Sequence, residues 1–138
     1  MAEITDQWKA RTRHFQFVIV SPDDLPADEA AALAEGVTDA FYSHGGMVFS
    51  ISSFLIVGGF GMLHTADSSQ QRKALVADLL ANFGNRIRIA HGQCNGIVGN
   101  LGSKYRSSYG AMIPGFQEIR EKLERSDLNT CFEALNEE

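Results

Sequence analysis

The stretch that most constrains the fold lies in the second half of the chain, where three local patterns follow one another. Residues 86–91 alternate arginine with isoleucine, which is typical of a strand with one buried face. Residues 92–103 are rich in glycine and predict a tight structural turn. Residues 117–126 place Ile119 and Leu123 four positions apart, on one side of a short charged helix. A strand, a turn and a helix are therefore expected in this order.

The segments before this stretch complete the order of elements. Apolar or alternating runs predict strands at 14–20, 47–52 and 54–60, and apolar stripes predict helices at about 26–43 and 68–82. The order β-α-β-β-α-β predicts an α+β, ferredoxin-like fold. Such a fold has an antiparallel sheet with helices on one face, here followed by an additional helix.

The length fits one domain with a single core. We expect residues 1–13 to form an N-terminal extension and residues 14–138 to form the domain itself.

Composition excludes several classes of function. The net charge of −5, without a cluster of Lys and Arg, argues against binding to nucleic acids. Residues 46–63 are mostly apolar, but serines and glycines interrupt them, so two buried strands explain them better than a membrane span. Cys94 and Cys131 are far apart in sequence, and no signal peptide is recognisable, so reduced thiols in the cytoplasm are expected.

Two glycine motifs carry a resemblance to a known family. The first is His44-Gly45-Gly46 after the first helix, and the second is Gly99-Asn100-Leu101-Gly102-Ser103 at the end of the predicted turn. They are followed by Arg106, Tyr109 and Leu123-Glu124. In this order the chain resembles the class III nucleotidyl cyclase domain, the adenylate/guanylate cyclase family, over roughly residues 15–124. The resemblance implies a dimer with its active sites at the interface, and a chain shortened after Glu124.

The resemblance also implies two aspartates that hold two metal ions, and neither is present. The first aspartate position falls on Ser21 and the second on Phe54, while the position of a base-contacting lysine falls on Ser50. A phenylalanine cannot bind a hard cation, and a serine hydroxyl is a weak substitute for a carboxylate. Asp23 or Asp24 is an alternative metal ligand, although adjacent acids after a proline are more typical of a solvated turn.

The late helix departs from the family in the same way. Aligned from Leu123, the family's asparagine and arginine positions fall on Glu118 and Lys122. A lysine keeps the charge but loses the two-pronged geometry of arginine. Aligned from Tyr109 instead, the same positions fall on Gln117 and Glu121. The base-selecting position is Gly115 or Pro114, which offers no side-chain hydrogen bond in either alignment.

These differences predict a catalytically inactive cyclase-homology domain without a metal or cofactor. It would act as a regulatory or protein-interaction module in signalling, as a homodimer or with another signalling protein. One alternative is a small-molecule or nucleotide sensor, whose candidate ligand-binding residues are Ser50, Asn100, Ser103, Lys104 and Arg106. A further alternative is a residual cyclase that converts ATP or GTP to a cyclic nucleotide.

Overall fold

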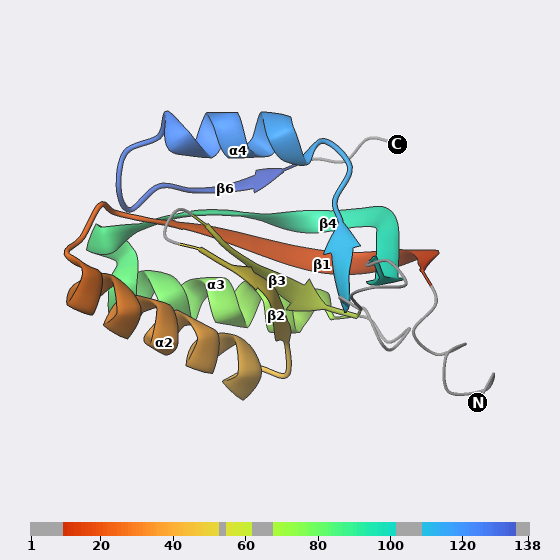
Figure 1. The fold of residues 1–138 in the computed structure, drawn as a ribbon, viewed down its shortest axis with the longest axis horizontal. Coiled ribbons are helices and arrows are strands. Elements are labelled where there is room, and N and C mark those ends of the chain that lie inside the picture. The colour runs from red at the N-terminus through yellow and green to blue at the C-terminus, as the bar shows by residue number, and fades with distance from the viewer. Residues whose placement is uncertain (1–9, 53–54, 62–67, 102–108, 135–138) are drawn as a thin grey trace.

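A computed structural model describes residues 10–52, 55–61, 68–101 and 109–134 of the chain, with the side chains of Asn100 and Tyr109 left out of the description. These residues form one twisted sheet with helices packed against it (Figure 1). In chain order the elements are β1 (Arg11–Pro22), α2 (Ala27–Ser43), β2 (Met47–Ile51), β3 (Ile56–Phe60), α3 (Ser69–Phe83), the short 3-10 helix η1 (Gly84–Arg86), β4 (Ile87–Asn100), β5 (Tyr109–Met112), α4 (Phe116–Glu124) and β6 (Cys131–Ala134).

The predicted ferredoxin-like core is confirmed. The strands lie side by side in the order β2-β3-β1-β4-β5, and all of these neighbours run antiparallel. β6 pairs with the first half of β4 in parallel, so the complete sheet is mixed. None of the described helices is long and apolar enough to cross a membrane.

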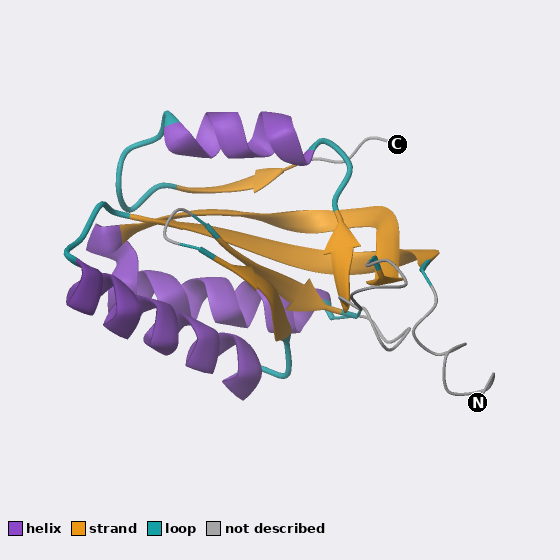
Figure 2. Cartoon of the chain, viewed as in Figure 1, coloured by secondary structure: helices purple, strands orange, loops and turns teal. Residues whose placement is uncertain are grey.

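The two faces of the sheet carry separate cores because successive side chains of a strand point in opposite directions. In β1, Val18 and Val20 face the apolar stripes of α2 and α3. Phe15, Phe17 and Ile19 face the other way, together with the α4 residues Ile119, Leu123 and Phe116. Figure 2 shows the result, with α2 and α3 on one side of the sheet and the shorter α4 on the other. The additional helix therefore does not join the face that holds the two core helices.

Helix α2 follows directly from its sequence. Leu33, Val37 and Phe41 recur at four-residue spacing and are all buried against the sheet. Asp28 and Glu29 lie in the first turn, where their negative charges interact favourably with the positive end of the helix dipole. The helix ends before Gly45, which takes a positive φ of 84°, so the predicted glycine stop is confirmed.

The predicted turn at 92–103 is wrong over most of its length, because β4 continues as a strand to Asn100. Two of its glycines serve close packing instead. A Cβ at Gly92 would lie 2.6 Å from the carbonyl oxygen of Ala134 and 3.1 Å from the Phe17 ring. A Cβ at Gly96 would overlap the carbonyl oxygen of Met112. Glycine at these positions lets neighbouring strands and rings approach the backbone.

Several boundaries also differ from the prediction. β1 begins at Arg11, three residues earlier than expected, because it remains paired with β4 to its first residue. The strands β5 and β6 were not predicted, since four residues are too few for a periodic pattern to stand out.

Candidate functional site

Ser21, on which the family's first aspartate position falls, lies near the end of β1 and is buried, with only 5% of its surface exposed. Its neighbour Val20 pairs with Ile56 of β3, and Ser21 itself pairs with Arg88 of β4. Alternation along β1 places Ser21 on the same face as Ile19, which is the face opposite α2 and α3. The strand end therefore presents a hydroxyl where the family resemblance implies a carboxylate.

Ser50 lies on the same face, two strands away. It pairs with Val57 of β3, which in turn pairs with Ile19 of β1. The β2–β3 pairing shifts its register between Val48 and Ser50. Phe54, on which the family's second aspartate position falls, lies outside the described residues.

The two alternative metal ligands sit in the turn that follows β1. Asp23 is partly buried and Asp24 is exposed, and the backbone N–H of Asp24 donates to Oδ1 of Asp23 at 2.8 Å. The backbone N–H of Asp23 donates to the carbonyl oxygen of Arg86 at 2.7 Å. Among the described residues, no group of three or more His, Cys, Asp or Glu side chains is placed to hold a metal ion.

The remaining predicted ligand-binding residues are only partly placed. Asn100 ends β4, where it pairs with Tyr109 of β5. Ser103, Lys104 and Arg106 lie outside the described residues, so their predicted role stays a prediction.

The candidate residues of α4 point to solvent or to β6. Glu118 is exposed, and the Lys122 ammonium lies 4.3 Å from the centre of the Phe132 ring in β6. In the second alignment, Gln117 donates from Nε2 to Oε2 of Glu121 at 3.2 Å. A cation over an aromatic ring and an i,i+4 hydrogen bond are both ordinary interactions of a helix surface.

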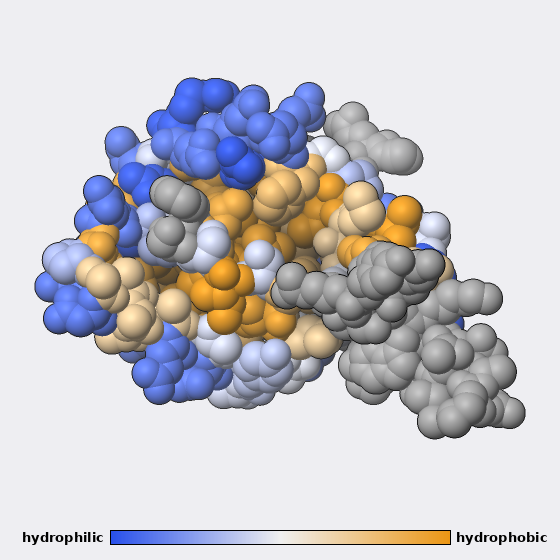
Figure 3. All heavy atoms as spheres, in the orientation of Figure 1, coloured by the Kyte–Doolittle hydropathy of each residue, from blue (hydrophilic) through white to orange (hydrophobic). Residues whose placement is uncertain are grey.

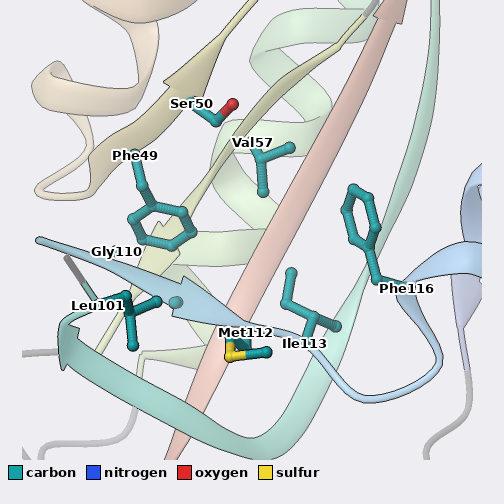
Figure 4. A pocket seen from close by; sticks show the side chains of 9 residues that line it. Phe49, Ser50, Val57, Leu101, Gly110, Met112, Ile113 and Phe116 are labelled. Carbon is teal, nitrogen blue, oxygen red and sulfur yellow. The ribbon is translucent and has the colours of Figure 1, made fainter. Parts of the chain in front are cut away.

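The structure adds a cavity that the sequence did not predict. It has a volume of about 360 Å³ and lies on the face of the sheet that carries Ser50 (Figure 4). Its lining comes from β2, β3, the end of β4, β5 and the start of α4: Phe49, Ser50, Val57, Leu101, Gly110, Ala111, Met112, Ile113 and Phe116. Figure 3 shows apolar side chains gathered in the middle of this view, below the charged α4.

A tight turn before α4 shapes one wall of the cavity. The backbone N–H of Phe116 donates to the carbonyl oxygen of Ile113 at 3.1 Å, and Gly115 between them takes a φ of 73°. This turn brings the Ile113 and Phe116 side chains to the same cavity. The sequence signal was present, because Pro114-Gly115 between two large apolar residues is typical of such a turn.

Solved structures share the fold of this chain, whereas no protein-family model and no curated protein matches the sequence. The guanylyl cyclase Cya2 matches with a TM-score of 0.74 and 15% identity over 91% of this chain and 76% of that one. The guanylate cyclase domain of RhGC from Catenaria anguillulae, in complex with GTP, matches with a TM-score of 0.68 and 11% identity over 89% and 78%. The chain has the fold of class III nucleotidyl cyclase domains.

The match extends to larger proteins of the same fold. A bacterial light-regulated adenylyl cyclase matches with a TM-score of 0.63 and 13% identity over 84% of this chain and 40% of that one. Identities this low show the fold alone, so the chemistry of this cyclase-fold domain has to be argued from its own residues.

The cyclase-fold domain also contains a buried polar cluster on the opposite face, under α3. Arg72 is only 2% exposed. Its Nε donates to Oε1 of Gln16 at 2.8 Å, its Nη1 contacts Nδ1 of His91 at 2.5 Å, and its Nη2 donates to Oε2 of Glu133 at 3.1 Å. One guanidinium therefore connects α3 to β1, β4 and β6. Sequence analysis did not select Arg72 as a buried residue, although it lies on the same side of the helix as Leu75 and Leu79.

We expect His91 to make the stability of the domain depend on pH. Burial lowers its pKa below the usual 6.5, the nearby Arg72 and Lys73 lower it further, and Glu133 opposes the shift. A pKa lowered in the folded state means that the neutral ring stabilises the fold above about pH 6.5. This contribution is lost as the pH falls below 6.5 toward the folded-state pKa, by at most about 1.4 kcal/mol per pH unit for one proton.

Urea unfolding measures this loss. It is carried out at several pH values between about 7.5 and 5.5, on either side of the ordinary histidine pKa of about 6.5. His91→Gln keeps an acceptor for Arg72 but cannot titrate, so its stability should fall less steeply than that of the wild type. His14→Gln serves as the control, because His14 is exposed and its side chain contacts Asn95, away from the cluster. Equal slopes for wild type and His91→Gln would contradict the prediction.

Proposed function

We propose that this domain retains the cyclase fold without the cyclase reaction, and that it acts as a regulatory or protein-interaction module. The observation that carries the proposal is Ser21, a buried serine at the strand end where the resemblance implies a metal-binding aspartate. Divalent cations such as Mg²⁺ prefer carboxylate oxygens, and a two-metal reaction depends on both ions. Phe54, at the second position, has no side-chain oxygen.

The chemistry of the cavity supports the same conclusion. Ser50 is the only polar side chain among its described lining residues, and none of these residues is charged. The described lining would give the phosphates of ATP or GTP no charged partner, and burying an uncompensated charge is costly.

We expect the purified protein to form no cyclic nucleotide from ATP or GTP, with either magnesium or manganese. Mass spectrometry of the reaction products tests this, and the guanylyl cyclase Cya2 provides a control of the same fold. Formation of a cyclic product would contradict the proposal. If that product disappeared in the Asp23→Asn/Asp24→Asn variant, the residual-cyclase alternative would take its place.

An interaction module also needs an accessible surface, and one apolar pair is suited to that role. Ile97 of β4 and Met112 of β5 are cross-strand partners, and they are 41% and 57% exposed. Large apolar side chains that remain exposed side by side are common at protein–protein contacts. We propose that this pair contributes to a homodimer or to a contact with another signalling protein.

Sedimentation velocity tests the homodimer. The wild type is expected to associate as its concentration rises, and Ile97→Asp is expected to remain monomeric with an unchanged melting temperature. Ile51→Asp is the matched control, because Ile51 is 55% exposed but belongs to β2, which is not a hydrogen-bonded neighbour of β4 or β5 in the sheet. A wild-type chain that stays monomeric at every concentration would contradict the homodimer.

The cysteines fit the cytoplasmic location that we propose from the sequence. Cys94 and Cys131 are both free thiols. Burial raises the pKa of Cys94 to about 12, so this thiol is protonated near neutral pH and is a poor nucleophile.

A further inference from the structure

We propose that the cavity between β2, β3, β5 and α4 binds a small, neutral, mainly apolar molecule. The inference rests on the proposed function, because it assumes that the domain no longer binds a nucleotide for catalysis. The cavity volume of about 360 Å³ falls within the range of small-molecule sites, about 300–1,000 Å³.

The lining determines the chemical class of the ligand. Phe49 and Phe116 form aromatic walls from opposite sides, and Val57 and Ile113, each only 7% exposed, lie between them (Figure 4). The described lining favours rings and alkyl groups and gives a charged group no compensation. Ser50 offers one hydroxyl, which has no hydrogen-bond partner within the described part of the chain. The ligand is therefore expected to carry one hydrogen-bonding group on an apolar body.

A β-bulge supplies two adjacent side chains to the cavity. Neighbouring residues of a regular strand point to opposite faces, yet Phe49 and Ser50 both line it. The register shift between Val48 and Ser50 is the reason, since an extra residue in one strand redirects the side chains beside it. Bulges are common next to binding sites for this reason. The turn at Gly115 redirects Ile113 and Phe116 in a similar way from the opposite side.

N-phenyl-1-naphthylamine, a neutral fluorescent arylamine, is a suitable probe for this site. We expect saturable binding of one probe per chain, and a rise in melting temperature because the probe binds the folded state. ATP or GTP with magnesium is expected neither to displace the probe nor to raise the melting temperature. Ser50→Trp, which fills the cavity from its rim, should weaken probe binding at least about tenfold, a loss of about 1.4 kcal/mol.

Ile51→Trp is the matched control. Ile51 is the next residue of β2, is exposed and does not line the cavity, so the same indole there should leave binding unchanged. Phe49→Ala is a second variant for the case in which Ser50→Trp fails to fold. It removes an aromatic wall and should weaken binding by a similar factor.

Three results would overturn the inference: no saturable binding, equal weakening by Ser50→Trp and Ile51→Trp, or displacement of the probe by ATP or GTP. A probe signal per chain that falls as the protein concentration rises would also overturn it, because a second copy of the chain would then occupy the cavity. Failure of probe binding without any cyclic product would reject only the cavity ligand. A cyclic product would reject the proposed function whatever the probe does.

Discussion

Replacing Gly59 with alanine is expected to destabilise the domain by more than about 3 kcal/mol, or to prevent it from folding. Gly59 lies in β3 and pairs with Phe17 of the central strand β1. A Cβ at this position would overlap the carbonyl oxygen of Gln16 and lie 3.1 Å from the Cα of Phe17. Both are backbone atoms, so no change of side-chain rotamer relieves the overlap. β3 would have to move away from β1, and the ladder between the two strands would be disrupted.

Urea unfolding followed by circular dichroism measures this loss. Gly110→Ala is the matched control, because it also adds a Cβ to a strand glycine, yet the nearest atom to that Cβ is Cδ1 of Leu101 at an ordinary 3.6 Å. Its stability is expected to change by less than about 1 kcal/mol. An unchanged stability of Gly59→Ala would contradict the β1–β3 register.

The core of the fold was predictable because its elements are long enough to show a period. The alternation in β1 and the four-residue spacing of Leu33, Val37 and Phe41 each identify an element and its buried side. The turn predicted at 92–103 failed for a different reason. Glycine permits both a turn and a close approach between strands, and only the partners at Gly92 and Gly96 distinguish the two.

The candidate site was predictable only in part. Ser21 and Ser50 lie on one face of the sheet, and their predicted correspondence to cyclase site positions stays a prediction. Phe54, Ser103, Lys104 and Arg106 fall outside the described residues, so their predicted roles are untested. The cavity escaped sequence analysis because its lining joins residues 49–57 to residues 101–116, and only the arrangement of β4 and β5 brings these segments together.

Arg72→Met should be the second strongly destabilising change, with a loss of about 3 kcal/mol. Methionine is a good helix former with a long unbranched side chain, so the loss reflects the hydrogen bonds more than the volume. Without the guanidinium, the buried Gln16 amide keeps, among the described residues, only its 3.2 Å side-chain hydrogen bond to Gln93. The charge-assisted bonds to Gln16 and Glu133 are lost, and such bonds are stronger than bonds between neutral groups.

The loss should be concentrated at β6. This strand pairs only with β4 among the described strands, and Glu133 attaches it to α3 through Arg72. Hydrogen exchange is therefore expected to speed up at the β6 amides more than at those of β1, which is paired on both edges. Lys73→Met is the control, because Lys73 is the next residue of α3 and is exposed, so it should change neither stability nor exchange by much. Unfolding of Arg72→Met at the same urea concentration as Lys73→Met would contradict this prediction, because the hydrogen bonds of the buried cluster would then add nothing to stability beyond packing. It would also weaken the predicted pH dependence of His91, which rests partly on its contact with Arg72.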